Sequence, residues 1–371
     1  MQDLRDKFPF WKHRRLTRRS TLFALGYSLV LSTTLFSCST PQNNSQQPTG
    51  SSASNTANTA STSNTSSSNQ KVIRIVRSKQ LTALAVLEQK GTLAKRLEPL
   101  GYKVEWPEFA AGPQQLEALN AGGLDIASTA ESPPVFAQAA GTPLVYLAAN
   151  SSDGRAVSLL VPTNSTVKSV KDLKGKKIAS QKASIGHYLI VKALEKEGLK
   201  LSDINPVYLP PPDANVAFSQ GKVDAWFIWE PFVTRNVQNK VGRVLIDGGN
   251  LRDTNNFLST TRKFYQENTE VIKVFLEELQ KAQVWARNNP KELAQLLAPV
   301  TQLDPPTLEI MHDKYDFALV PITEQIINKQ QQVADMWYNL KLIPKQVNVR
   351  DGFLTPEQYA EITPKEVLAQ K

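Results

Sequence analysis

ALNAGGLDI, at residues 118–126, has a second copy in AFSQGKVDA, at residues 217–225. Each copy ends a stretch with helical periodicity, turns at a glycine and continues into a short apolar run. Glycine accepts the left-handed backbone with which many helices end, and such an apolar run is typical of a buried strand. Two units of this kind predict two similar lobes, although two unrelated turns would give the same pattern. Asp125 and Asp224 are expected to support the structure rather than to contact a ligand.

Short apolar runs alternate with helical patterns along the chain after Val72. The strand-like runs are at residues 72–76, 104–106, 124–127, 144–147, 157–161, 177–179, 207–209, 225–228 and 244–246. This alternation predicts an α/β fold in which each lobe is a mostly parallel sheet flanked by helices. The last third of the chain has helical periodicity, and we assign it to the first lobe.

The sequence predicts five consecutive segments. In chain order they are an export signal (1–37), a linker (38–70), the first part of lobe 1 (71–161), lobe 2 (162–259) and the rest of lobe 1 (260–371). The chain would cross between the lobes twice, near residues 161–163 and 259–261. Two such crossings side by side make a hinge, so the sequence predicts a protein that can close over a ligand.

The N-terminal segment has the composition of an export signal. Basic side chains precede a largely apolar, uncharged run at residues 20–37, and Cys38 follows it. LFSC at 35–38 resembles the lipobox of bacterial lipoproteins, which implies a lipid on Cys38. An uncleaved anchor is the alternative, because about 18 residues only just span a bilayer. The paired Arg18 and Arg19 leave the Sec and Tat export routes both open. The linker that follows Cys38 carries no charged side chain, which predicts disorder.

The composition argues against several classes of function. Without residues 1–37, which hold seven basic and two acidic side chains, the formal charge falls from +9 to +4. No basic stripe with interleaved aromatic residues follows, so nucleic-acid binding is not expected. Cys38 is the only cysteine, and His187 and His312 are far apart in the sequence, so we expect neither a disulfide nor a metal site. The segment ASIG at 183–186 lacks the first glycine of a G-x-S-x-G elbow, which argues against a serine hydrolase.

Four loops follow strand-like runs at positions where a ligand would bind. They are residues 78–82, 129–134, 180–187 and 228–231. In open α/β sheets, ligands bind at the carboxyl ends of the strands, and the N-termini of the helices that follow favour an anion. Trp229 is expected to face the cleft and Trp226 the core, because side chains three apart on a strand point to opposite faces. The alternatives are ordinary loop chemistry and two buried tryptophans.

The loops also carry motifs that resemble aliphatic sulfonate-binding proteins of ABC importers, in the type II periplasmic binding protein group. The similarity covers about residues 72–349. Its most specific stretches are EFAAGPQ (108–114), STAESPPVFAQAAG (128–141), DLKG (172–175), QK (181–182), VDAW (223–226) and IWEP (228–231). The resemblance implies a receptor that captures an alkanesulfonate, as a sulfur source, between its two lobes and delivers it to a membrane permease.

The same resemblance implies where the ligand binds. The expected ligand-binding residues are Gln80, Leu81, Thr82, Thr129, Glu131, Ser132, Ala183, Ser184, His187, Trp229 and Glu230. From the sequence, the favoured role of Glu131 and Glu230 is pairing with Lys79, Lys182 or backbone N–H groups, and reading an amine on the ligand is the alternative. The loop at 78–81 departs from the Gln-Lys-Gly-Ser that this family tends to have, which leaves the identity of the ligand open.

The expected partners are a small anion, the permease subunits of an ABC importer, and a membrane that the chain reaches through lipidated Cys38. We expect a monomer in the periplasm or at the cell surface, with no cofactor and no nucleic-acid partner. Nitrate, bicarbonate, taurine and a pyrimidine precursor are the alternative ligands. An enzyme on the same fold is the alternative class of function.

Overall fold

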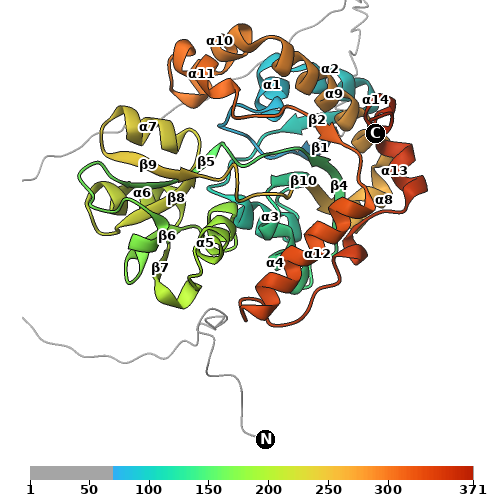
Figure 1. The fold of residues 1–371 in the computed structure, drawn as a ribbon. Helices are drawn as coiled ribbons and strands as arrows, with labels where there is room; N and C mark the ends of the chain where they lie inside the picture. The colour runs from blue at the N-terminus through green and yellow to red at the C-terminus, as the bar shows by residue number, and fades with distance from the viewer. Residues whose placement is uncertain (1–69, 371) are drawn as a thin grey trace, which may run out of the picture. The chain divides into compact units, whose positions relative to one another are not determined.

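A five-stranded sheet is built from the middle of the chain in the computed structural model, which describes residues 70–370 (Figure 1). In the order β7-β6-β8-β5-β9, its strands are β7 (Asn205–Tyr208), β6 (Lys177–Ser180), β8 (Ala225–Trp229), β5 (Val157–Pro162) and β9 (Gly242–Asp247). The helices that connect these strands are η3 (Val170–Leu173), α5 (Ile185–Lys196), η4 (Leu201–Asp203), α6 (Pro211–Ser219) and α7 (Phe232–Gln238).

The remaining strands form a four-stranded and a two-stranded sheet. In the order β11-β4-β10-β3, the larger contains β11 (Leu319–Val320), β4 (Leu144–Asn150), β10 (Asn256–Thr261) and β3 (Ala127–Thr129). The smaller pairs β1 (Lys71–Arg74) with β2 (Tyr102–Glu105). A parallel bridge between Ile75 and Ile126 joins the end of β1 to the residues before β3.

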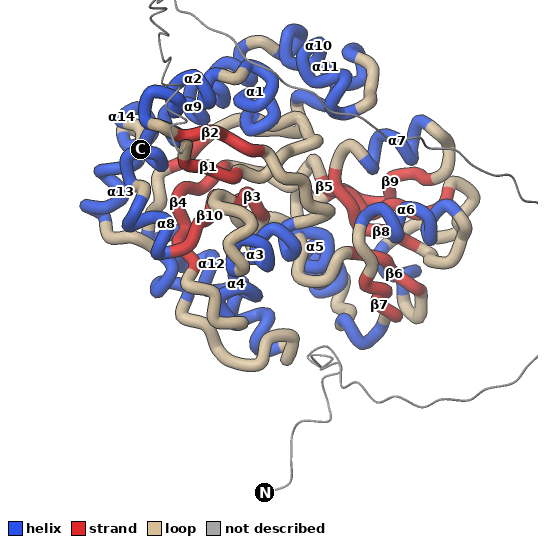
Figure 2. The backbone as a smooth tube through the Cα atoms, turned by 180° about the vertical axis from the view of Figure 1, so that it is seen from behind, coloured by secondary structure: helices blue, strands red, loops and turns tan. Residues whose placement is uncertain are grey.

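Helices surround these sheets, as Figure 2 shows. Before β5 they are α1 (Ala83–Lys90), α2 (Thr92–Leu97), η2 (Glu98–Leu100), α3 (Gly112–Asn120) and α4 (Ser132–Ala139). After β10 they are α8 (Arg262–Glu267), α9 (Thr269–Asn288), α10 (Pro290–Thr301), α11 (Pro305–His312), α12 (Glu324–Asn339), η5 (Val349–Gly352), α13 (Pro356–Ile362) and α14 (Lys365–Leu368). Within residues 70–370, no helix combines the length and the apolar character needed to cross a membrane.

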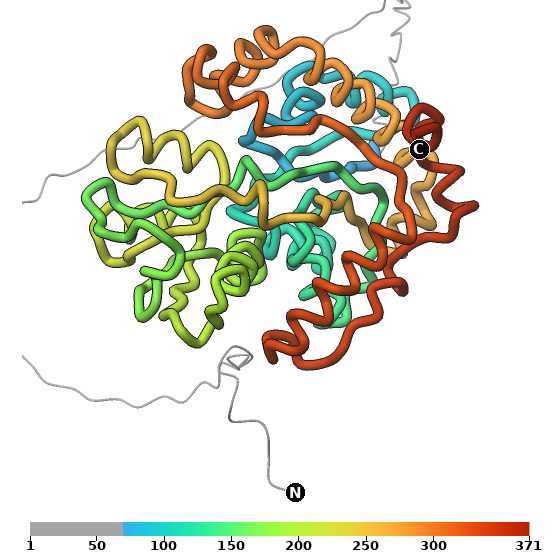
Figure 3. Tube along the Cα trace, viewed as in Figure 1, coloured from blue at the N-terminus to red at the C-terminus, as the bar shows by residue number. Residues whose placement is uncertain are grey.

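The helical C-terminal third packs on the elements that begin the described chain. Helix α9 contacts α1, α2 and α13, and α12 contacts α4. Figure 3 shows much of the trace after β10, in orange and red, beside the blue and cyan segments that begin the described chain. The helices after β10 therefore pack on elements of the four-stranded and two-stranded sheets, which come from the beginning of the described chain.

The two copies of the repeated sequence have equivalent positions. Gly122 and Gly221 both have positive φ, 76° and 66°, two residues after the helix that ends within each copy. The carboxylate of Asp125 accepts the N–H of Arg74 at 2.7 Å, and that of Asp224 accepts the N–H of Lys177, also at 2.7 Å. Each aspartate thus ties the turn after a helix to a neighbouring strand, which is the supporting role expected for both residues.

The sheets are mixed, whereas the sequence predicted mostly parallel ones. Parallel pairs join β1 to β2, and β6 to both β7 and β8. Antiparallel pairs join β5 to β8 and β9, and β10 to β3 and β4. Parallel pairing between consecutive strands needs a long crossover connection. Strands β5 and β10 instead enter their sheets directly from the other sheet, so the alternation of runs did not reveal their direction.

The chain passes between the sheets in two short connecting segments, residues 151–156 and 248–255. Strand β5 pairs only within the five-stranded sheet and β10 only within the four-stranded one, among the described pairings. Both connecting segments therefore lie before the predicted crossings near 161–163 and 259–261. An apolar run such as 157–161 carries no sign of which sheet it will join, which explains the offset.

The two connecting segments touch each other through glycine backbone. A Cβ atom added to Gly154 would lie 2.6 Å from the carbonyl oxygen of Gly248, and one added to Gly248 would lie 2.7 Å from that of Gly154. Gly154 also has a φ of 85°, a conformation that side chains disfavour. Only glycine fits at this contact, so the segments approach as closely as backbone allows.

Candidate functional site

A cleft of about 780 Å³ opens between the five-stranded sheet and the elements of the other two sheets. Its walls include the loop after β1 on one side and the ends of β8 and α5 on the other, and both connecting segments contribute to its lining. Cavities of roughly 300–1,000 Å³ hold small-molecule ligands in proteins. The cleft therefore has room for a ligand larger than a small inorganic ion.

The first predicted loop lies at the N-terminus of α1. Gln80, Leu81 and Thr82 all line the cleft. The side chain of Thr82 accepts the N–H of Ala85 at 3.4 Å and donates to Ser78 at 2.8 Å, which caps the helix. The unpaired N–H groups of this first helical turn lie at the cleft wall, where they favour a negative charge.

Ser184 occupies the same place at the N-terminus of α5 and lines the opposite wall. Its Oγ atom accepts the N–H groups of Gly186 and His187, at 3.1 and 3.4 Å, and donates to the carbonyl of Gln181 at 2.7 Å. The hydroxyl proton is therefore already engaged. What this helix end presents to the cleft is the partial positive charge of its N-terminus.

Ala183 and His187 lie behind this helix end and are absent from the cleft lining. The N–H of Ala183 donates to Nδ1 of His187 at 3.2 Å, and Nε2 of His187 lies 3.0 Å from the hydroxyl of Tyr208. Burial, together with the charge of Lys182, lowers the pKa of His187 to about 3. A neutral ring with its proton on Nε2 fits both contacts, so His187 fixes the loop and does not bring a charge to the cleft.

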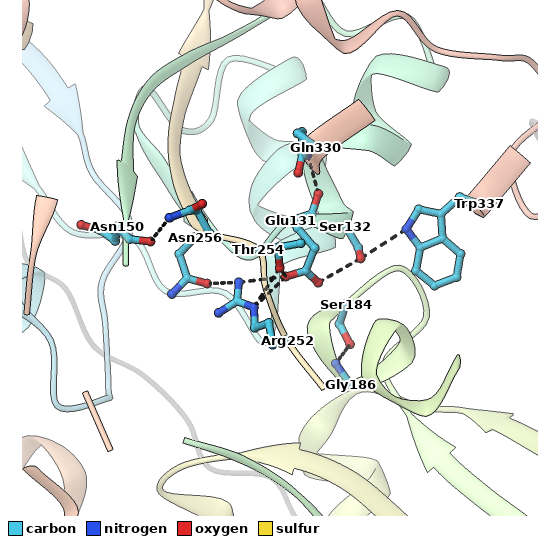
Figure 4. Close-up of polar contacts among 11 residues, drawn as sticks. Glu131, Ser132, Asn150, Ser184, Gly186, Arg252, Thr254, Asn256, Gln330 and Trp337 are labelled. Carbon is cyan, nitrogen blue, oxygen red and sulfur yellow. Dashed lines mark hydrogen bonds and ion pairs between the residues drawn. The ribbon is translucent and has the colours of Figure 1, made fainter. Parts of the chain in front are cut away.

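Of the three ligand-binding residues predicted at 129–134, one lines the cleft and two belong to a buried network. Thr129 lines the cleft. Glu131 is fully buried and pairs with Arg252, whose Nη2 lies 2.8 Å from Oε2 (Figure 4). Ser132 donates to the other carboxylate oxygen at 3.1 Å and accepts the indole N–H of Trp337 at 3.3 Å.

Glu230 is likewise buried and paired. Its carboxylate contacts Nζ of Lys314 at 2.6 Å and accepts the N–H and the hydroxyl of Thr234, each at 3.0 Å. Structural pairing was the role that the sequence favoured over reading an amine. The N–H of Thr234 is a backbone partner of the expected kind, whereas the cationic partner of Glu230 is Lys314 rather than Lys79 or Lys182. Lys79 instead pairs with Glu108 at 2.7 Å. Glu131 and Glu230 thus both have cationic partners from the protein.

Trp226 lies in the core and Trp229 lines the cleft, as the strand alternation predicted. Trp226 is fully buried among the aromatic rings of Phe218 and Phe232. Trp229 is partly exposed and lines the cleft. Its indole offers an apolar surface on which the body of a ligand can pack.

Several cleft residues carry no signal in the sequence. The basic residues that line the cleft are Arg77, Lys79, Arg235, Arg252 and Lys314, and the acidic ones are Glu88, Glu108 and Asp316. Arg77 and Lys79 pair with Glu88 and Glu108. Arg252 and Lys314 belong to segments that no motif marked. Among residues 70–370, no group of His, Cys, Asp or Glu side chains is placed to hold a metal ion.

Comparison with known proteins gives consistent similarities. The model of the NMT1-like family matches residues 72–300. A curated protein of Escherichia coli (strain K12), whose name describes aliphatic sulfonate binding, is 40% identical over 257 residues, which cover 69% of this chain and 81% of the relative.

Two solved structures share the fold along most of the described chain. The alkanesulfonate-binding protein SsuA from Xanthomonas axonopodis pv. citri, bound to MOPS, is 35% identical with a TM-score of 0.73, and the match covers 76% of this chain and 98% of SsuA. The periplasmic aliphatic sulphonate binding protein SsuA from Escherichia coli is 38% identical with a TM-score of 0.69, covering 77% and 92%.

Proposed function

The chain belongs to the NMT1-like family, and from this premise we propose that it is the extracytoplasmic substrate-binding component of an ABC importer and captures an alkanesulfonate. The named relatives are binding proteins for aliphatic sulfonates rather than enzymes. Their match also confirms the α/β fold of type II periplasmic binding proteins that the sequence predicted.

The observation that carries the proposal is the electrostatic character of the cleft. Two capped helix N-termini, at Thr82 and Ser184, lie on opposite walls. Five basic and three acidic residues line the cleft, and four of the basic ones (Arg77, Lys79, Arg252 and Lys314) are paired with a carboxylate of the protein. The helix N-termini therefore supply most of the attraction for an anion. A sulfonate stays ionised at physiological pH, so its recognition needs fixed donors rather than proton transfer.

We infer a ligand site from the predicted residues that reach the cleft, which are Gln80, Leu81, Thr82, Thr129, Ser184 and Trp229. Their support is their common place in the lining. Glu131, Ser132, Ala183, His187 and Glu230 take positioning roles in the proposal, because their polar atoms are already bonded to the protein.

The two lobes close about the connecting segments in this proposal. One lobe consists of residues 71–150 with 256–370, and the other of residues 157–247. The pairing of β5 and β10 supports these limits. The glycine contact between the segments gives the lobes a common pivot. Closure would exclude water and strengthen each hydrogen bond to the ligand.

The membrane anchor is a separate proposal that rests on the sequence. Cys38 and the signal before it lie outside the described residues. We propose that lipid-modified Cys38 holds a monomer at the periplasmic face or cell surface, next to the permease subunits. Metabolic labelling with a tritiated fatty acid tests this. Label on the wild type and its loss in Cys38→Ala are expected, and an unlabelled wild type would contradict lipidation.

Calorimetry with a ligand panel tests the main proposal. The full chain would be titrated with hexanesulfonate, taurine, nitrate and bicarbonate. We expect one hexanesulfonate bound per chain, with weaker or absent heat from the inorganic anions. Binding of nitrate or bicarbonate without any sulfonate would refute an alkanesulfonate receptor. Preference for taurine would move the assignment to aminosulfonates.

A further inference from the structure

Arg252 lies in the second connecting segment and lines the cleft between the two sheets. Its side chain has no solvent exposure, although an arginine side chain is rarely buried without a partner. Arg252 therefore places a positive charge in the lining of the cleft, out of contact with solvent. Neither its position nor its charge was marked by the sequence.

Three groups hold one edge of the guanidinium. Nε donates to Oε2 of Glu131 and to Oγ1 of Thr254, both at 3.1 Å. Nη2 donates to the same Glu131 oxygen at 2.8 Å and to Oδ1 of Asn256 at 2.9 Å. These bonds fix the plane of the group, because a guanidinium presents its donors in a rigid fork.

The remaining nitrogen, Nη1, is buried and has no hydrogen-bond partner among residues 70–370. In Figure 4 the guanidinium turns this nitrogen away from the Glu131 carboxylate. Buried donors are nearly always paired, and an unpaired donor on a charged group is costly. The missing partner therefore has to be supplied by something other than the described chain.

Glu131 cannot supply it by a small movement. Its Oε2 atom already takes the Arg252 and Thr254 donors, and its Oε1 atom takes the hydroxyl of Ser132. A second observation points to the cleft. Oγ1 of Thr129, two residues before Glu131, is also buried without a partner, and Thr129 lines the same cleft.

We propose that Nη1 of Arg252 donates to an oxygen of the bound sulfonate, directly or through one ordered water, and that Glu131 positions Arg252 for this contact. The inference rests on the proposed function and names the charged donor of its ligand site. Because the acceptor oxygens of Glu131, Thr254 and Asn256 already fix the guanidinium, little side-chain entropy is lost when the ligand binds. Arg252 also belongs to a connecting segment, so the contact couples the ligand to the proposed hinge.

A purely structural role for Arg252 would tie the connecting segment to the start of α4. Its loss would then weaken every ligand to the same extent. A residue that reads charge affects an anion more than a neutral ligand of the same shape. The ratio of the affinities for hexanesulfonate and hexanesulfonamide separates the two roles, because the amide keeps the chain and nearly the shape of the head group but not its charge.

The experiment measures this ratio by calorimetry for the full-length wild type, Arg252→Gln and Arg252→Lys. We expect Arg252→Gln to lower the ratio about tenfold to a hundredfold, the range for a hydrogen bond to a charged group. Arg252→Lys keeps the charge but lacks the fork, so the ratio should fall by about fivefold or more. Should the glutamine variant fail to fold, the lysine variant decides the question alone.

Lys329→Met is the matched control. Lys329 donates to the carbonyl of Asp253 at 2.9 Å and so anchors the same connecting segment from outside the cleft. Its loss should leave the ratio within about twofold of wild type. An unchanged ratio in the Arg252 variants would overturn this inference alone. Failure of the wild type to bind any sulfonate would overturn the proposed function, and the inference with it.

Discussion

Lys314 and Glu230 form an ion pair across the cleft, with Nζ of the lysine 2.6 Å from Oε1 of the glutamate. Lys314 lies between α11 and β11, and Glu230 directly follows β8. The carboxylate is almost completely buried and the lysine side chain is 32% exposed. The pair therefore joins the five-stranded sheet to the helices on the other side of the cleft.

Lys314→Met should weaken ligand binding through the conformational equilibrium. Without the lysine, the buried Glu230 charge loses its cationic partner across the cleft, so opening of the cleft becomes more favourable. Allowing for the exposure of the lysine, we expect a loss of about 1 kcal/mol, or roughly fivefold in affinity. Calorimetry with hexanesulfonate measures it, and small-angle scattering without ligand should give a larger radius of gyration.

Lys192→Met is the control for this variant. Lys192 pairs with Glu195 one turn along the same helix, at 3.0 Å, and crosses no cleft. It should leave both the affinity and the radius of gyration at the wild-type values. Wild-type affinity in Lys314→Met would refute a role of the pair in closure.

His187 should make the folded state sensitive to acid. Burial lowers its pKa to about 3 from an ordinary 6.5. Between these values the unfolded chain binds a proton that the folded one does not. Above pH 6.5 the ring is neutral in both states and has no effect on stability. As the pH falls through this window the folded state loses stability, with a slope approaching about 1.4 kcal/mol per pH unit.

His187→Gln tests this dependence, since a glutamine oxygen can still accept the N–H of Ala183. Urea unfolding at about pH 7, 6 and 5 gives the free energies. Carboxylates titrate in both proteins, so the informative quantity is the difference between wild type and variant. That difference should shrink as the pH falls. A difference independent of pH would mean that the folded His187 ring takes up a proton normally.

Trp229→Ala should lose ligand affinity while the protein stays folded. The indole lines the cleft, and removing an aromatic contact of this kind costs about 1 kcal/mol or more. Trp226→Ala provides the contrast, because its ring is fully buried and its loss should destabilise the fold by about 3–5 kcal/mol. Calorimetry and thermal melting separate the two effects. Equal affinities of Trp229→Ala and wild type would exclude contact with the ligand.

The sequence predicted the two-lobed fold because the repeated phrase has a local cause. A glycine ends each helix and an aspartate then binds a neighbouring backbone N–H, so both residues are needed where they stand. The directions of β5 and β10 had no such local mark. Their apolar runs fit either sheet, and only the packing of the connecting segments decides which one they join.

The cleft, too, could be predicted only where its residues have a local mark in the sequence. Thr82 and Ser184 follow strands and cap helices, and a sequence can reveal this arrangement. Arg252 and Lys314 reach the cleft only through tertiary folding. Arg252 binds Glu131 across 121 residues of chain, and no pattern near either residue pointed to the other. The lysines expected beside Glu131 were chosen from adjacent loops, whereas the partner came from the connecting segment.

Gly154→Ala should lower the free energy of unfolding by more than the unfavourable positive φ of an alanine at this position explains. The new Cβ would lie 2.6 Å from the carbonyl oxygen of Gly248, with a φ of 85°. Gly175 shares the positive φ, 74°, but has no atom within 4 Å of an added Cβ. Gly175→Ala should therefore lose about 1–2 kcal/mol of unfolding free energy, and Gly154→Ala about 1–3 kcal/mol more. Urea unfolding measures both, and equal losses would contradict a tight contact between the connecting segments.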